Sequence, residues 1–215
     1  MRLRRKSAAE PEPADLPDVA ESAVDDEEPT GPATVDAEDL TEEELADRID
    51  LGSLLILPPA DGKELRLQVD EASGTVQSVL IAGPDGVVEL RAFAAPRNGD
   101  LWSEVRPAIA ADMARRGGTA TEQEGPFGTE LYCEIGATLD DGRTGVQMSR
   151  ILGVNGSRWL LRATLLGEPA RRGADASEWE SLVAGIAVRR GQGALPPGEA
   201  LPLVLPEQAR RVDPA

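Results

Sequence analysis

The sequence has no histidine and only one cysteine, Cys133, among its 215 residues. Histidine and cysteine are the side chains that most enzymes use for proton transfer, nucleophilic attack and zinc binding near neutral pH. Their scarcity excludes a Ser-His-Asp triad, a Cys-His pair and an ordinary zinc site, because a site built from carboxylates alone favours magnesium or calcium. A single thiol also excludes a disulfide bond within the chain.

Motifs for nucleotide or acyl chemistry are absent as well. The chain has no Gly-x-x-x-x-Gly-Lys phosphate loop, no Gly-x-Gly-x-x-Gly after a strand and no Gly-x-Ser-x-Gly elbow. We therefore predict a protein that is not an enzyme and that uses no cofactor and no metal. Asp140 and Asp141 are interpreted as turn residues. The competing hypothesis is a magnesium-dependent hydrolase with Asp and Glu ligands, which the lack of histidine does not forbid.

Negative charge is concentrated at the start of the chain. Residues 1–50 carry 17 acidic and 5 basic side chains, whereas residues 51–215 carry 22 and 17. Without a basic surplus in the folded part, nucleic-acid binding is not expected. No stretch reaches the roughly 18–20 apolar residues needed to cross a bilayer, and no apolar run follows the basic residues 1–6 as in a signal peptide. These absences predict a cytoplasmic protein.

Composition divides the chain into four parts. The first has almost no large apolar side chains, so it cannot offset its ordering entropy and is predicted to be disordered. Thr41 and Glu44 then form a capping box that starts a short helix. Near the end, residues 201–205 form an extended edge segment or a loose tail. The four parts are an acidic disordered tail (1–40), a short helix (41–50), an α+β domain (51–190) and a Pro-rich C-terminal extension (191–215).

Apolar alternation predicts about seven strands, and apolar stripes at helical spacing predict two main helices. Because hairpin turns join successive strands, the sheet is mostly antiparallel and the fold is α+β in a single domain. The first helix is either kinked at Pro107 or starts near Ser103, so that the proline falls in the first turn. Asp175 caps the second helix. The predicted strands are 54–57, 65–69, 76–81, 87–93, 131–137, 146–152 and 159–165, and the helices are 100–116 and 176–188.

Two turns set the expected pairing of the last three long strands. Asp141-Gly142 and Asn155-Gly156 are both favoured two-residue hairpin turns. If each closes such a turn, the large apolar residues of the three strands share one face that covers a core. On that face Arg150 lies between Cys133 and Leu161. The other expected pairs are Ala137 with Val146, Ile135 with Met148, Leu131 with Leu152, Leu152 with Trp159, Met148 with Ala163 and Val146 with Leu165.

Arg150 is the exception on this apolar face. Because an unpaired buried charge is costly, Arg150 has an internal partner, turns outward at a bulge, or contacts an anionic ligand. Cys133 beside it is interpreted as a small buried residue, since no general base is available to activate it. On the opposite face Glu134, Ser149 and Arg162 form one cross-strand row, which is interpreted as a surface ion pair.

Tryptophan supplies three of only six aromatic side chains. Trp159 and Trp179 lie on apolar stripes and are predicted core residues. Trp102 lies beside the stripe of its helix and is predicted to be a partial surface anchor for a ligand or partner. The candidate binding residues are Arg150, Trp159, Met148, Trp102 and Arg106, and no catalytic or metal-binding residue is predicted.

Several segments are similar to one known family. They are 50–58 (DLGSLLILP), 101–109 (LWSEVRPAI), 125–128 (GPFG), 158–162 (RWLLR) and 167–169 (GEP). The chain resembles the actinobacterial domain of unknown function 3710 over about residues 45–190. This resemblance implies a cytoplasmic bacterial protein and transfers no catalytic residue, since the family has no established activity. The order of elements is also similar, more faintly, to the Mog1/PsbP/LpqN-like α+β fold, whose members are mainly binding or assembly factors.

Two hypotheses for function follow. The first is a non-enzymatic interaction module that docks an unidentified protein partner, with the acidic arm adding reach or shielding a basic surface. The second is a small-molecule or lipid-binding domain that uses the face around Arg150, Trp159 and Met148, with Arg150 holding a carboxylate or phosphate head group.

Overall fold

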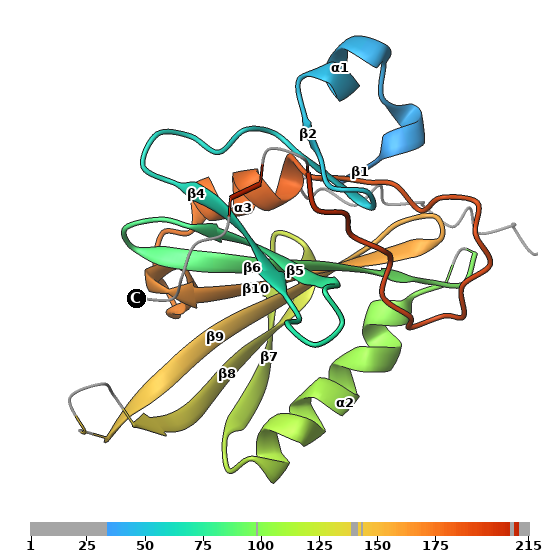
Figure 1. Cartoon of the computed structure of the whole chain (residues 1–215). Helices are drawn as coiled ribbons and strands as arrows, with labels where there is room; N and C mark the ends of the chain where they lie inside the picture. The colour runs from blue at the N-terminus through green and yellow to red at the C-terminus, as the bar shows by residue number, and fades with distance from the viewer. Residues whose placement is uncertain (1–33, 98, 139–141, 143, 207–208, 211–215) are drawn as a thin grey trace, which may run out of the picture.

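The computed structural model describes residues 34–97, 99–138, 142, 144–206 and 209–210. The predicted disorder of residues 1–33 lies outside the described residues. In the described part, a seven-stranded antiparallel sheet carries helices and a smaller sheet (Figure 1). This arrangement confirms the predicted α+β fold. No helix of the described residues is long and apolar enough to cross a membrane.

The main sheet has the strand order β4-β5-β6-β10-β9-β8-β7, and all its neighbouring strands are antiparallel. The predicted turn between β5 and β6 is present, because Gly83 N donates a hydrogen bond to Gly86 O at 2.9 Å. The strands are β4 (Glu64–Val69), β5 (Val76–Ala82), β6 (Gly86–Ala94), β7 (Thr119–Gly125), β8 (Gly128–Thr138), β9 (Thr144–Asn155) and β10 (Trp159–Gly167).

A smaller sheet, in the order β1-β11-β3-β2, joins segments that are distant in the sequence. β1 and β11 are parallel, with Val35 opposite Ala187. The predicted tail therefore differs from the structure over residues 34–40, which are structured because Ala37 is buried against Leu55. The elements here are β1 (Val35–Asp36), a 3-10 helix (Ala37–Asp39), β2 (Ile49–Asp50), β3 (Leu54–Ile56) and β11 (Ala187–Val188).

α1 and α2 begin at polar caps. The predicted capping box of Thr41 and Glu44 is present at the start of α1 (Glu42–Ala46). α2 (Leu101–Arg115) begins after Asp100, whose Oδ1 accepts a hydrogen bond from Ser103 N at 3.0 Å. Pro107 therefore lies inside α2, and the alternative in which the helix starts near Ser103 is wrong.

The last helix is shorter than predicted. α3 (Ser177–Ala184) ends at Gly185, and the buried residues that follow belong to β11. The apolar stripe that predicted the helix continues into β11. Apolar periodicity over a few residues does not distinguish the end of a helix from a short buried strand. Asp175 Oδ1 accepts a hydrogen bond from Ser177 N at 3.0 Å, although Ala176 holds the capping position.

Both faces of the main sheet are covered, because apolar residues occupy both alternating sets of positions in its central strands. On one face Leu152 and Leu161 pack with Trp179 of α3. On the other face Leu131 and Leu160 pack beneath α2. Figure 1 shows α2 beside β7 and β8, away from α3. The prediction of a single apolar face is therefore wrong.

The predicted register between β8 and β9 is wrong by one residue. The last pair before the turn is Thr138 with Thr144, so residues 139–143 connect the strands. This connection has an odd number of residues, whereas the predicted two-residue turn has an even number. A change from even to odd moves every side chain of one strand to the other face of the sheet relative to the prediction. Arg150 consequently lies opposite Tyr132, and Cys133 lies opposite Ser149. The other observed pairs include Ala137 with Gly145, Ile135 with Gln147 and Leu131 with Ile151.

The turn between β9 and β10 also differs from the prediction. Gly156 N donates a hydrogen bond to Trp159 O at 2.8 Å, so Ser157 and Arg158 form the two-residue turn. Gly156 instead provides space, because a Cβ atom there would overlap the Trp159 ring. Asn155-Gly156 is a turn signal in the sequence, but in the structure Gly156 is needed because the indole of Trp159 packs where its side chain would be.

This second shift changes the neighbour of Arg150 but not its face. Leu152 lies opposite Ala163 instead of Trp159, four residues further along β10. Since four is an even number, Arg150 remains on the Leu161 face, where Leu165 is its neighbour. Cys133, however, lies on the opposite face, beneath α2.

The C-terminal extension pairs with both sheets. Ala200 forms a bridge with Phe93 of β6, and Leu203 forms a bridge with Gly52. Leu201 N donates a hydrogen bond to Ala92 O at 2.8 Å. Of the two alternatives for this segment, the extended edge segment is confirmed. It completes the end of β6 that β5 does not reach.

Candidate functional site

Arg150 is buried and bound by two carboxylates. Its Nε and Nη2 donate hydrogen bonds to Glu130 Oε2 and Oε1 at 2.6 and 3.1 Å, and Nη2 lies 2.7 Å from Glu180 Oε1. The Arg150 side chain is 5% exposed and that of Glu130 is 0% exposed. Of the three alternatives for Arg150, the internal carboxylate partner is therefore confirmed.

Two glutamates share this one guanidinium. Burial raises the pKa of Glu130, and the charge of Glu180 adds to the increase, although the hydrogen bonds from Arg150 oppose it. Burial alone would lower the pKa of Arg150, but its bonds to the glutamates raise that pKa overall. With all three groups ionised, one positive and two negative charges leave a net negative site.

Trp159 and Met148 belong to the core on the same face. Trp159 is 1% exposed, which confirms its prediction as a core residue, and its Nε1 donates a hydrogen bond to Asp36 Oδ1 of β1. Met148 is partly buried against the same cluster. Trp179 of α3 is also 1% exposed, as predicted. These side chains hold α3 and the smaller sheet on the main sheet.

Trp102 and Arg106 lie on α2, on the other face. Trp102 is 3% exposed, so its prediction as a partial surface anchor is wrong. Its Nε1 donates a hydrogen bond to Thr129 O at 2.6 Å, and its ring fills the space that Gly153 leaves. Arg106 Nε donates to Glu122 Oε1 at 2.9 Å, and its guanidinium carbon lies 5.9 Å from the centre of the Trp102 ring.

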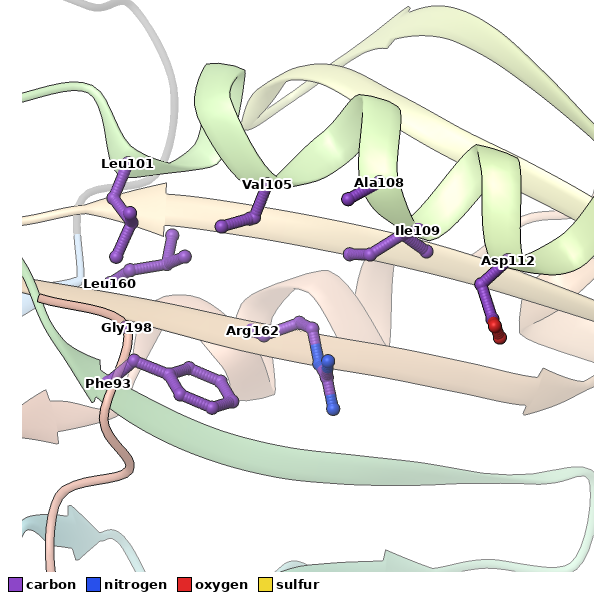
Figure 2. Close-up of a pocket in the computed structure, with 9 residues that line it drawn as sticks. All are labelled: Phe93, Leu101, Val105, Ala108, Ile109, Asp112, Leu160, Arg162 and Gly198. Carbon is purple, nitrogen blue, oxygen red and sulfur yellow. The ribbon is translucent and has the colours of Figure 1, made fainter.

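An open apolar groove of about 400 Å³ runs between α2 and the sheet (Figure 2). At one end, Leu101 of α2 faces Phe93 of β6 and Leu160 of β10. At the other end, Arg162 of β10 and Asp112 of α2 supply the polar groups. The other lining residues are Val105, Ala108 and Ile109 of α2 and Gly198 of the C-terminal extension.

Arg162 lies directly opposite Arg91 of β6, so two guanidinium groups are neighbours at the polar end. Both side chains are half-buried. Neither forms a hydrogen bond or ion pair with a described residue, and Arg91 Nε is buried without a partner there. The ring centre of Phe93 lies 5.4 Å from Arg91 Cζ and 5.3 Å from Arg162 Cζ. The groove of Figure 2 together with Arg91 is named the arginine groove below.

The electrostatics at this end favour an added anion. Burial lowers the pKa of Arg162, and the charge of Arg91 lowers it further, whereas Glu89 opposes this. Like charges directly opposite in a sheet cost roughly 0.2–1 kcal/mol. The nearby Asp112 lies 2.8 Å from the exposed Arg115, and Glu89 forms no ion pair with either groove arginine among the described residues. A carboxylate from outside would therefore meet two guanidinium groups that have no described acidic partner.

Other candidate chemistry lies elsewhere or is absent from the described part. Cys133 is 1% exposed, as expected for a small buried residue, and burial raises the pKa of its thiol. Over residues 34–97, 99–138, 142, 144–206 and 209–210, no group of three or more acidic or cysteine side chains is placed to hold a metal ion. Asp140 and Asp141 lie outside the described residues.

Arg91 and Phe93 were not among the residues predicted from the sequence. The predicted surface row of Arg162, Glu134 and Ser149 is wrong, because Arg162 lies opposite Arg91 on one side and Gly153 on the other. A signal was nevertheless present in the sequence, since charged Glu89 and Arg91 alternate with apolar residues along β6. That alternation puts both of the missed residues on the face away from the α3 core.

Comparison with known proteins assigns the chain to no protein of established function. A family model described as "Protein of unknown function (DUF3710)" matches residues 31–212. No curated protein matches the chain. A crystal structure from Bacteroides thetaiotaomicron VPI-5482 aligns with 14% sequence identity and a TM-score of 0.39, over 64% of this chain and 45% of that one. The chain thus spans less than half of that protein. The actinobacterial origin and the Mog1/PsbP/LpqN-like fold remain predictions.

Proposed function

Because the chain belongs to the DUF3710 family of proteins of unknown function, we propose its function from the structure. It is a non-enzymatic cytoplasmic module that binds a protein partner in the arginine groove. The partner contributes an extended segment that carries both acidic and apolar side chains. The observation behind this proposal is the adjacent pair Arg91 and Arg162, which have no carboxylate partner among the described residues.

The two ends of the arginine groove suit two kinds of side chain. At the apolar end, Leu101, Phe93 and Leu160 can bury one aliphatic side chain, which contributes roughly 1.5–3 kcal/mol when burial is complete. At the other end, the guanidinium groups of Arg91 and Arg162 can donate charge-assisted hydrogen bonds to a carboxylate. A segment with an apolar residue near an acidic one matches both ends.

Most other half-buried or buried arginines of the described residues are bound by oxygen atoms of the fold. Arg48 and Arg190 donate hydrogen bonds to the backbone oxygens of Gly185 and Gly193, and three further arginines have a carboxylate within reach. Arg106 binds Glu122, Arg150 binds two glutamates, and Arg189 Nη1 lies 2.7 Å from Asp50 Oδ2. Arginine is also frequent among the residues that dominate binding energy at protein interfaces. A carboxylate from a partner would give the groove arginines the hydrogen-bond acceptor that these other arginines find within the fold.

We do not place a ligand at Arg150 and Trp159, the alternative from the sequence. Arg150 is paired with two internal carboxylates, and α3 packs on that face through Trp179. The arginine groove differs in both respects, since it is open and its arginines lack described partners.

Selection from a random peptide library tests the proposal. The full chain is immobilised, and bound peptides are sequenced after selection on the wild type and on the double variant Arg91→Ala/Arg162→Ala. We expect enrichment of peptides in which an acidic residue lies close to a leucine, isoleucine, valine or phenylalanine. Individual peptides should bind the double variant at least about tenfold more weakly, which corresponds to about 1.4 kcal/mol.

A second double variant controls for charge. Arg116→Ala/Arg171→Ala removes the same charge from exposed positions at the end of α2 and after β10. It should bind the selected peptides like the wild type, while all three proteins keep the same circular dichroism spectrum. Failure to enrich acidic and apolar peptides, or equal binding by the groove variant, would contradict the proposal.

A further inference from the structure

We propose that the acidic segment 7–33 of the same chain occupies the arginine groove and competes there with the partner. This inference rests on the proposed function, because it names a regulator of the same groove. The segment contains nine acidic residues and no lysine or arginine. The groove in turn presents two arginines without a described carboxylate partner. The two surfaces are therefore complementary in charge.

The composition of the segment also fits the apolar end of the groove. Leu16, Val19 and Val24 are the aliphatic residues larger than alanine, and each has an acidic residue within two positions. The segment contains five prolines, and proline disfavours helix both for itself and for the preceding residue. The segment thus places acidic residues close to aliphatic ones, which is the composition proposed above for the partner.

The described chain starts on the α3 face of the main sheet, where Thr34 Oγ1 donates a hydrogen bond to Val183 O at 3.4 Å. Asp36 of β1 accepts a hydrogen bond from Ser157 Oγ at 3.0 Å and another from Trp159 Nε1. Both donors belong to the hairpin between β9 and β10, and the next residue, Leu160, lines the arginine groove. The segment that precedes Thr34 is therefore attached at the end of the sheet where the apolar part of the groove lies, but on the opposite face, so it has to pass around the sheet to reach the groove.

The segment is long enough to reach the arginine end. Its 27 residues span about 90 Å when fully extended. As a flexible chain they have a root-mean-square length of about 30 Å, similar to the dimensions of a domain with a radius of gyration of about 16 Å. Attachment at this distance gives an effective concentration of about 1 mM at the groove. Even a weak contact therefore competes with a partner in solution.

Paramagnetic relaxation in the full chain tests the contact directly. A nitroxide is attached at Ser22→Cys, which reacts selectively because Cys133 is buried. We expect the backbone amide signals of Phe93, Leu160 and Arg162 to broaden more than those of β4 and β11. The broadening should disappear in the chain that also carries Arg91→Ala/Arg162→Ala, and it should decrease in about 1 M salt, where the Debye length is about 3 Å. Equal broadening with and without the two arginines would overturn the inference.

A second measurement separates this inference from the proposed function. In the full chain, the nine acidic residues of segment 7–33 are replaced by Asn or Gln, and binding of a library-selected peptide is measured by fluorescence anisotropy. With an effective concentration of about 1 mM and a segment affinity of about 0.1–1 mM, the neutral segment should increase peptide affinity about 2- to 10-fold. Unchanged affinity would overturn the competition while leaving partner binding intact. Relaxation contacts at the groove without any selectable peptide would instead overturn the proposed function.

Discussion

The packing of α2 on the sheet can be tested by adding one methyl group at Gly153. A Cβ atom at this position would lie 2.5 Å from Cε3 of the Trp102 ring and closer still to two other ring atoms. Carbon atoms in contact are normally about 3.5–4.0 Å apart. In Gly153→Ala the ring must therefore move by about 1 Å or more, and α2 must move with it.

The expected cost follows from what that movement disrupts. Overfilling a packed core costs about 1–3 kcal/mol. The Trp102 ring is also held by the 2.6 Å hydrogen bond to Thr129 O, and losing such a bond costs about 0.5–1.5 kcal/mol. Together these terms predict that Gly153→Ala lowers the free energy of unfolding by about 2–4 kcal/mol. For a domain of this size, the melting temperature should fall by about 4–16 °C.

Gly136→Ala is the matched control in the neighbouring strand. No atom lies within 4 Å of a Cβ atom built at Gly136, which is exposed in β8. Because glycine within a strand is unfavourable by roughly 0.5–1 kcal/mol relative to alanine, this substitution should leave stability unchanged or raise it slightly. Urea unfolding, followed by tryptophan fluorescence and circular dichroism, measures both variants. If the changes in the free energy of unfolding caused by the two substitutions differ by less than about 0.5 kcal/mol, the described packing of Trp102 against Gly153 is wrong.

Four further predictions concern charged and buried groups. Arg150→Met should cost about 3–5 kcal/mol, because it leaves the buried Glu130 and the partly buried Glu180 without a cation. Glu130→Gln should cost less than about 1 kcal/mol, because Arg150 keeps Glu180. Thermal unfolding that reverses this order would refute the shared-guanidinium arrangement. Since the pKa of Glu130 is raised in the fold, its protonated form favours folding. The stability of the wild type relative to Glu130→Gln should therefore be highest below the unfolded pKa of about 4.3 and should fall as the pH rises through the raised pKa. A stability difference that stays constant in urea unfolding between pH 4 and pH 8 would contradict the raised pKa of Glu130. Arg162→Met should raise the melting temperature by a few degrees, because it removes a half-buried charge without a described partner, and a lower melting temperature would indicate a structural role. Alkylation of Cys133 should be at least about 100-fold slower in the native state than in urea, because burial both hides the thiol and raises its pKa. Rapid labelling of the native protein would show that Cys133 of β8 is exposed.

Sequence reasoning identified the fold where local signals agreed. Strand alternation, the capping box at Thr41 and the helix that starts after Asp100 all appear in the structure. The core positions of Trp159 and Trp179 also followed from their stripes. These features depend on neighbouring residues, which a single sequence displays directly.

The pairing of strands was not predictable in the same way. Hairpin register depends on whether the connection has an odd or even number of residues, and a turn signal does not fix that number. Between β8 and β9 the odd connection placed Cys133 beneath α2. The β6–β10 pair, which brings Arg91 next to Arg162, joins strands more than 60 residues apart. Since no local pattern encodes such a contact, the arginine groove became visible only in three dimensions.

The parallel pair of β1 and β11 links the beginning and the end of the fold. Val35 lies opposite Ala187, and Leu203 of the C-terminal extension pairs with Gly52. During synthesis on the ribosome, the smaller sheet therefore cannot be completed until residues 187 and 188 have emerged. The long hairpins of the main sheet involve shorter loops and can form earlier, since loop closure costs more entropy as the loop lengthens. A chain that stops before Ala187 would contain α3 but lack β11, the strand that joins β1 to β3, so β1 and its hydrogen bond from Trp159 Nε1 to Asp36 would lose their support.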